Sequence, residues 1–84
     1  MTRYTVVWSQ EALDLLAQIW ISADDKQEVT AASDEIDREL AVDPESKGDL
    51  EGERIRVLRI PPLRVTFSVH VDDRIVRVSL VKRT

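Results

Sequence analysis

The sequence predicts an α+β fold in which a two-helix hairpin packs on one face of a mainly antiparallel four-stranded sheet, in the order β-α-α-β-β-β. Three observations predict it. Residues 3–8 are rich in β-branched and aromatic side chains, apolar residues recur at helical spacing between residues 10 and 40, and alternation takes over from residue 53. Because 84 residues support one hydrophobic core, we expect a single domain, residues 1–84.

The first strand is expected at residues 3–8, and Ser9 directly after it is a favoured N-cap residue. An apolar stripe at the i, i+3, i+4, i+7 spacing of an amphipathic helix follows and is predicted to face the core. Its members are Leu13, Leu16, Ala17 and Trp20. Trp8 and Trp20 are therefore expected to be core anchors.

Asp24 and Asp25 interrupt this helix and are expected to cap a second one. The second helix is predicted to end before Pro44, because proline disfavours helical geometry in the residue before it. Its apolar stripe consists of Val29, Ala32, Ser33, Ile36 and Leu40. Two such stripes in succession predict the helical hairpin, and residues 43–52 are predicted to be a loop.

Residues 53–60 are predicted to form a strand whose apolar positions change parity. Ile55 and Val57 alternate first, and Leu58 and Ile60 then take over, so a β-bulge or bend is expected near Val57-Leu58. Pro61-Pro62 is predicted to be a turn, since proline cannot donate to a strand ladder.

The clearest alternation lies in residues 63–71, followed by a turn at Asp72-Asp73 and a last strand. The side chains expected on the core side are Leu63, Val65, Phe67, Val69, Val71, Val76, Val78 and Leu80. Ile75, Arg77, Ser79 and Val81 are expected to face outward.

Composition excludes several classes of function. There is no cysteine and only one histidine, His70, so neither a disulfide nor a thiolate or histidine metal site is expected, and no cofactor is predicted. No run approaches the ~20 apolar residues of a membrane span, and Met1–Tyr4 begins no signal peptide. We therefore expect a cytoplasmic protein without a membrane partner.

Charge is unevenly distributed along the chain, although the net charge is only −4. Residues 1–49 carry four basic and twelve acidic side chains, whereas residues 50–84 carry eight basic and four acidic ones. This asymmetry predicts that the two halves face different surroundings.

A helical hairpin covers one face of a sheet, so the polar members of the alternation are expected on the other face. They are Arg54, Arg56, Arg64, Thr66, Ser68, His70, Arg77 and Ser79. Four arginines on one open face suit phosphates or carboxylates, because guanidinium groups bind both in bidentate fashion. The simpler alternative is an ordinary solvated sheet face, with His70 solvated as well.

Three segments resemble the RelE/ParE superfamily of toxins from type II toxin–antitoxin systems, which include plasmid stabilisation proteins. Val7-Trp8-Ser9-Gln10-Glu11-Ala12 is similar to the family's first strand and helix start. Asp43-Pro44, Gly48 and Gly52-Glu53-Arg54-Ile55-Arg56 are similar to its central loop and strand, and Leu63-Arg64-Val65-Thr66-Phe67-Ser68-Val69 to the strand after it. With the predicted element order, these segments extend the resemblance along nearly the whole chain.

The resemblance implies a growth-inhibiting toxin held in check by a cognate antitoxin, and two kinds of target. RelE-like members cleave messenger RNA on the ribosome, whereas ParE-like members poison DNA gyrase by protein contact. In a nuclease, Arg64 would match the central strand arginine and Arg54 and Arg56 would fall near a basic pair. His70 would be the possible acid or base. Arg77, Lys82 and Arg83 are expected to contribute to binding, Lys82 and Arg83 resembling the basic residues after the family's last strand.

Three features favour the ParE-like or non-catalytic function over the nuclease, so whether the chain is an enzyme stays open. No residue matches the functional tyrosine that RelE-like enzymes carry after the last strand, and arginine is a poor general base. The net acidity also disfavours docking to ribosomal RNA. The remaining alternatives are the ribosome-dependent endoribonuclease and a decayed or regulatory binding module that keeps only the fold.

Overall fold

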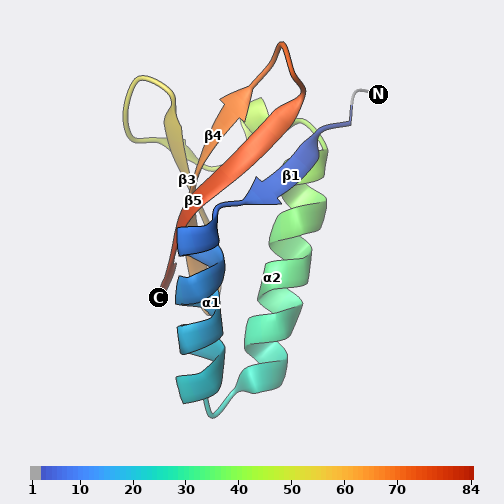
Figure 1. Ribbon diagram of the computed structural model, residues 1–84. Helices are drawn as coiled ribbons and strands as arrows, with labels where there is room; N and C mark the ends of the chain where they lie inside the picture. Colours follow the sequence, from blue (N-terminus) through green and yellow to red (C-terminus); the bar gives the residue numbers. More distant parts are fainter. Residues whose placement is uncertain (1–2) are drawn as a thin grey trace.

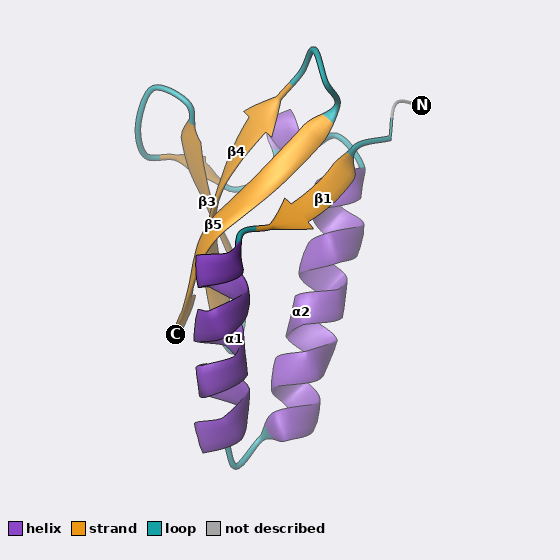
Figure 2. Ribbon diagram, in the orientation of Figure 1, coloured by secondary structure: helices purple, strands orange, loops and turns teal. Residues whose placement is uncertain are grey.

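The computed structural model describes residues 3–84; Met1 and Thr2 lie outside the described residues. The elements are β1 (Thr5–Trp8), α1 (Gln10–Ser22), α2 (Lys26–Ala41), the 3₁₀ turn η1 (Pro44–Ser46), β2 (Asp49–Leu50), β3 (Ile55–Ile60), β4 (Leu63–His70) and β5 (Ile75–Arg83). The two helices run side by side as a hairpin against the sheet (Figures 1 and 2). The predicted α+β class and hairpin are confirmed.

The sheet has five strands in the order β1-β5-β4-β3-β2, so the prediction of four strands is wrong. β1 is parallel to β5, and the other neighbours are antiparallel. The additional strand, β2, lies within the predicted loop and pairs with Val57 and Arg56 of β3. Gly48 brings the chain alongside β3, because it has a φ of +68° and a Cβ there would lie 2.3 Å from the Val57 carbonyl oxygen. A strand of two residues leaves no alternation to detect.

Local signals locate the helix ends correctly. The Oγ of Ser9 accepts a hydrogen bond from the backbone N–H of Ala12 at 3.0 Å, which confirms it as the N-cap of α1. Asp25 precedes α2, but its side chain makes no capping hydrogen bond. Within residues 3–84, neither helix has the length and apolar character required to cross a membrane.

The predicted inward stripe of α1 is wrong in part. The residues that contribute to the core are Ala12, Leu15, Leu16 and Ile19, together with Ala23 after the helix. Leu13, Ala17 and Trp20, which the stripe predicts inside, are exposed, so only Leu16 of its four members faces the core. Eight of the thirteen residues of α1 are apolar, so two overlapping stripes have helical spacing and the period does not distinguish them.

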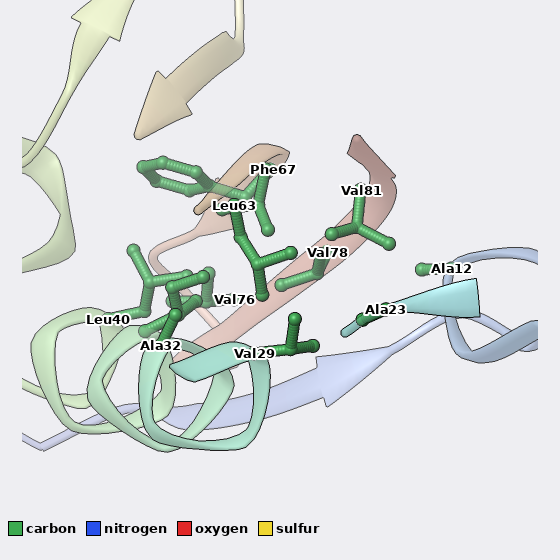
Figure 3. Packing of buried hydrophobic residues seen from close by; sticks show 12 residues of the cluster. Ala12, Ala23, Val29, Ala32, Leu40, Leu63, Phe67, Val76, Val78 and Val81 are labelled. Atoms are coloured by element: carbon green, nitrogen blue, oxygen red, sulfur yellow. The ribbon is translucent and has the colours of Figure 1, made fainter. Parts of the chain in front are cut away.

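The core lies between the hairpin and the central strands β4 and β5 (Figure 3). Leu63, Val65 and Phe67 of β4 are fully buried, as the alternation predicts. Val29, Ala32, Ile36 and Leu40 pack against them from α2, which confirms the predicted stripe of that helix apart from half-buried Ser33. Trp8 packs at the edge of this core, and its indole N–H donates to Asp37 at 2.7 Å.

The β-bulge lies in β5, not in β3 as predicted. Thr66 of β4 pairs with Leu80 and Phe67 pairs with Val78, which leaves Ser79 as an extra residue between them. The alternation of β5 is therefore reversed after Ser79. Val81 is 1% exposed and belongs to the core, whereas Leu80 is 36% exposed, so the expected sides of these two residues are wrong.

β3 pairs with β4 without any register shift. Leu58 and Ile60 lie on the helix side and pack against the core, and Arg56 lies on that side because it pairs with Phe67. Ile55 and Val57 consequently lie on the opposite side, with Arg59. Val57 is buried there between β2 and β4, which explains why an apolar residue interrupts the expected parity.

The reversed alternation predicts unequal effects of one substitution at neighbouring positions. We expect Val81→Asp to abolish the cooperative unfolding transition, because it places an unpaired carboxylate in the core. We expect Leu80→Asp to retain the fold and to lower the free energy of unfolding by less than about 2 kcal/mol. Urea unfolding followed by circular dichroism measures both. A larger loss of unfolding free energy in Leu80→Asp than in Val81→Asp would contradict the position of the bulge.

Candidate binding face of the sheet

The sheet face opposite the helices carries a transverse row of basic side chains. Residues that pair directly across a ladder lie on the same face. Arg59 of β3 pairs with Arg64 of β4, and Arg64 pairs with Lys82 of β5. We call Arg59, Arg64 and Lys82 the basic row, and the face on which they lie the open face.

Few carboxylates neutralise the basic row. Asp49 lies 3.8 Å from Arg59, with both side chains largely exposed, so this ion pair is weak. Among residues 3–84, no carboxylate oxygen lies within 4.0 Å of Arg64 or Lys82. Like charges directly opposite one another destabilise a sheet, so the row costs folding free energy. An arrangement of this kind suits an anionic partner, which would remove the repulsion.

Apolar side chains adjoin the basic row on the open face. The next transverse row consists of Val57, Thr66 and Leu80, and the row after that contains Val7, Ile55, Ser68 and Arg77. Val7, Ile55 and Leu80 are exposed. Tyr4, Trp8 and Phe67 pack with the core and Trp20 is on α1, so within residues 3–84 the open face has no aromatic ring on which a base could stack.

The structure divides the predicted site residues between different places. Arg64 and Arg77 share the open face, as their positions in the alternation predict, and Lys82 joins them because the bulge reverses the end of β5. The expectation that Arg56 joins them is wrong: it lies on the helix side, where its guanidinium donates to the Lys47 carbonyl at 3.4 Å. Arg54 lies in a bend before β3 and belongs to no strand.

His70 lies far from the basic row. It is six residues from Arg64 along the extended strand β4, which corresponds to about 20 Å. Its Nε2 is 3.1 Å from the Ser68 Oγ. His70 lines a pocket of about 480 Å³ with Arg54 and Arg56. Glu45, Glu53, Asp72 and Asp73 line the same pocket. These four carboxylates outnumber the two guanidinium groups, so the pocket is a poor phosphate site.

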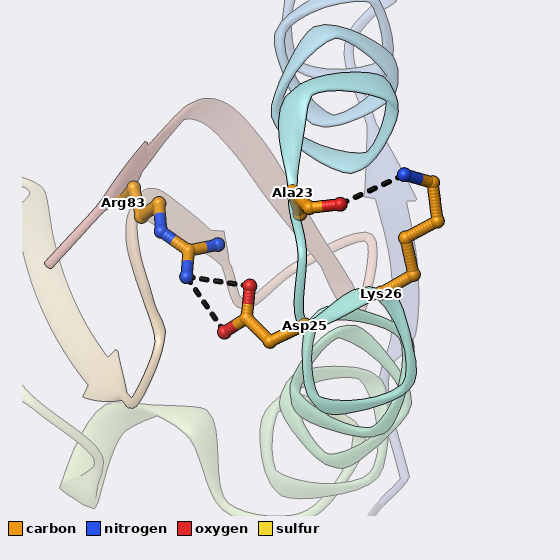
Figure 4. A network of polar contacts seen from close by, with 4 residues as sticks. All are labelled: Ala23, Asp25, Lys26 and Arg83. Atoms are coloured by element: carbon orange, nitrogen blue, oxygen red, sulfur yellow. Dashed lines mark hydrogen bonds and ion pairs between the residues drawn. The ribbon is translucent and has the colours of Figure 1, made fainter.

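Arg83 lies on the helix side because the bulge reverses the end of β5. Its Nη2 donates to both carboxylate oxygens of Asp25 at 2.6 Å (Figure 4). The hydrogen bond from Arg83 lowers the pKa of Asp25 below its ordinary value of 3.8. Lys26 donates to the Ala23 carbonyl at 2.7 Å beside it. The Arg83–Asp25 contact ties the end of β5 to the turn between the helices, and the Lys26–Ala23 hydrogen bond lies within that turn.

The sequence interpretation missed Arg59, which completes the basic row. The signal was present: if Leu58 and Ile60 are taken as the inward residues of β3, Arg59 points outward beside Arg64. Giving priority to Ile55 and Val57 assigned Arg54 and Arg56 to the open face instead. The error came from Val57. It is apolar and buried, which suggests the helix side, but it lies on the face opposite the helices.

The sequence matches no protein-family model and no curated protein sequence. Its fold, in contrast, closely matches chains of solved toxin–antitoxin structures. A chain of the RelBE2 toxin–antitoxin complex from Mycobacterium tuberculosis has a TM-score of 0.79 at 17% identity, covering 100% of this chain and 94% of that one.

Two further structures extend the likeness. A chain of the chromosomal ParDE system from P. aeruginosa has a TM-score of 0.68 at 16% identity, covering 98% of this chain and 97% of that chain. A chain of the archaeal RelE-RelB complex from Pyrococcus horikoshii has a TM-score of 0.70 at 18% identity, covering 99% of this chain and 96% of that chain. The resemblance to RelE/ParE toxins is thus confirmed at the level of the fold, and it includes both RelE and ParE systems.

Repulsion in the basic row predicts that removing its central charge stabilises the protein. We expect Arg64→Gln to raise the free energy of unfolding by about 0.2–1 kcal/mol at low salt, the size of a cross-strand pair. The gain should shrink as salt screens the charges. Urea unfolding at two salt concentrations measures it, with Arg54→Gln, outside the sheet, as the matched control. The prediction is contradicted if Arg64→Gln lowers the free energy of unfolding and Arg54→Gln does not.

The Asp25–Arg83 pair predicts a pH dependence of stability. Because the pKa of Asp25 is lowered in the folded protein, its stabilisation is present above the ordinary value of 3.8 and is lost as pH falls through the lowered pKa. Asp25→Asn should therefore lower the melting temperature at pH 7. Thermal unfolding at neutral and strongly acidic pH measures this, and the difference from the original protein should disappear in acid. Asp24→Asn is the control, and an equal effect there would contradict the assignment.

Proposed function

We propose that this chain is the toxin of a type II toxin–antitoxin module, which inhibits growth until a cognate antitoxin binds it. The fold it shares with RelE and ParE system chains supports a toxin. The basic row is the observation that carries the proposal. Its like charges face one another across neighbouring strands and lower the stability of the isolated chain, so a binding partner is the simplest reason for them. An anionic surface on the target, and acidic side chains of the antitoxin, would each neutralise it.

The open face favours inhibition by protein contact, the ParE-like mechanism. Cleavage of RNA requires a group that moves a proton close to the cations that hold the phosphate. Arginine and lysine side chains are ordinarily cationic and are poor proton acceptors, and His70 lies about 20 Å from Arg64 along β4. The exposed apolar residues Val7, Ile55 and Leu80 add area that a protein surface can bury. DNA gyrase is accordingly our proposed target.

A RelE-like endoribonuclease is the second candidate, and the basic row itself favours it. Three cations on neighbouring strands would stabilise the charge that develops on a phosphate during cleavage. In that case the site would consist of Arg59, Arg64 and Lys82, and a basic group of the ribosome would accept the proton of the attacking 2′-hydroxyl.

Growth on induction tests the proposal. Expression of the chain without an antitoxin should arrest growth, and Arg64→Glu should weaken inhibition at least about tenfold, since reversing one interfacial charge costs several kcal/mol. The matched control is Arg54→Glu, which carries the same charge change outside the sheet. Normal growth with the original chain, at verified expression of folded protein, would overturn the toxin assignment.

Two assays with the purified chain then separate the targets. ParE-like action predicts inhibition of DNA supercoiling by gyrase and no cleavage of messenger RNA on purified ribosomes. Ribosome-dependent cleavage that Arg64→Ala abolishes would instead establish the second candidate.

A further inference from the structure

The pocket of about 480 Å³ that His70 lines lies between two walls from different parts of the chain. Side chains from the segment 45–56 form the first wall, and the end of β4 with the turn after it, residues 69–73, forms the second. Pairing between β3 and β4 stops at Ile55 and Ser68, so β4 projects past the start of β3 at this end of the sheet (Figure 1). We call this hollow the end pocket.

The charged side chains of the end pocket have no ionic partners. They are Glu45, Glu53, Arg54 and Arg56 on the first wall and Asp72 and Asp73 on the second. Among residues 3–84, none of these six makes an ion pair within 4.0 Å. Opposite charges therefore surround one hollow without contact, and this arrangement suits a ligand that carries charges of both signs.

The two walls differ in the charges that they present. The first wall combines guanidinium groups with carboxylates, and Arg56 uses only one of the five N–H donors of its guanidinium, on the Lys47 carbonyl. The second wall presents the carboxylates of Asp72 and Asp73. The head of an α-amino acid, with its carboxylate and ammonium together, matches the first wall. A separate ammonium group matches the second.

Each wall also contributes an exposed apolar side chain. Leu50 of the first wall is 61% exposed, and Val71 of the second is 50% exposed. Neither residue belongs to the hydrophobic core. An aliphatic stem that joins the two charged ends of a ligand would cover both side chains and remove apolar surface from water.

Backbone hydrogen bonds hold both walls in place. In the first wall the Glu51 N–H donates to the Ile55 carbonyl at 2.9 Å. In the second the Arg74 N–H donates to the Val71 carbonyl at 3.2 Å, and the Arg74 carbonyl accepts from the Thr5 N–H at 2.9 Å. A pocket with fixed walls loses little conformational entropy when it binds a ligand.

We propose that the end pocket binds a free basic amino acid, of which lysine is the simplest case. The α-carboxylate and α-ammonium lie against the first wall, and the side-chain ammonium lies against Asp72 and Asp73. The four carboxylates outnumber the two guanidinium groups, which favours a ligand of net positive charge. This site goes beyond the proposed toxin function. It shares no residue with the basic row, so either proposal can fail without the other.

A nuclear magnetic resonance titration of the full, ¹⁵N-labelled chain tests the inference with three ligands at low salt. L-Lysine should shift the amide signals of residues 45–56 and 69–73 and saturate them with a Kd below about 1 mM. Norleucine lacks the side-chain ammonium, and 1,5-diaminopentane lacks the carboxylate. Each should bind at least about tenfold more weakly than lysine, because each leaves one charged wall without its partner.

Substitutions on the two walls should affect different ligands. Arg54→Gln should weaken lysine binding at least about tenfold without weakening that of 1,5-diaminopentane. Asp72→Asn should weaken the binding of lysine and of the diamine without weakening that of norleucine. Arg77→Gln and Asp24→Asn make the same charge changes outside the pocket and should leave the Kd of lysine unchanged.

The amide spectrum of each variant shows whether it is folded, so loss of binding is separated from loss of structure. The inference is overturned if lysine at about 10 mM shifts no amide of the pocket, or shifts only those of α1 and α2. It is also overturned if the diamine binds as tightly as lysine, or if Arg54→Gln has no effect on lysine binding. Arg54→Gln should retain growth inhibition, which separates the end pocket from the basic row.

Discussion

The extra residue at Ser79 determines which side of the sheet the end of β5 occupies. Without it, plain alternation would place Leu80 and Lys82 toward the helices and Val81 and Arg83 on the open face. With it, Val81 completes the core, Lys82 lies beside Arg64, and Arg83 reaches Asp25. One inserted residue therefore accounts for a core contact, a member of the basic row and the tie between β5 and the hairpin.

Neighbouring elements fix the position of this bulge. The Ser79 Oγ donates to the Thr66 carbonyl at 3.3 Å, which joins the extra residue to β4. On the other side the Ser9 N–H donates to the Val78 carbonyl at 2.9 Å, where β1 ends and α1 begins. The N-cap of α1 and the bulge of β5 thus share one junction. The start of the hairpin and the reversal of β5 are set by the same contacts.

Local chemistry made the element boundaries predictable, whereas the faces of the elements depended on tertiary contacts. Ser9 caps α1 through a side-chain hydrogen bond to the backbone three residues on, and Pro44 acts on the residue before it, so both effects are visible in the sequence. The inward side of α1 depends on which of two apolar stripes meets β5, and no property of the helix alone decides it. The parity change in β3 predicts a bulge there, but that change reflects burial of Val57 between β2 and β4, and β2 is too short to be recognised in the sequence.

These side assignments also change what the chain requires of its partners. The open face presents Arg59, Arg64 and Lys82 with exposed apolar neighbours, whereas the outer side of the hairpin has an apolar groove, lined by Leu13, Trp20 and Ile21, among acidic side chains. A single partner chain that covered both surfaces would need basic side chains in one segment and acidic side chains in another. Uniformly acidic partners would neutralise the basic row but would be repelled by the hairpin. Because the two surfaces select opposite charges, the order of charge along a partner chain would determine the direction in which it can bind.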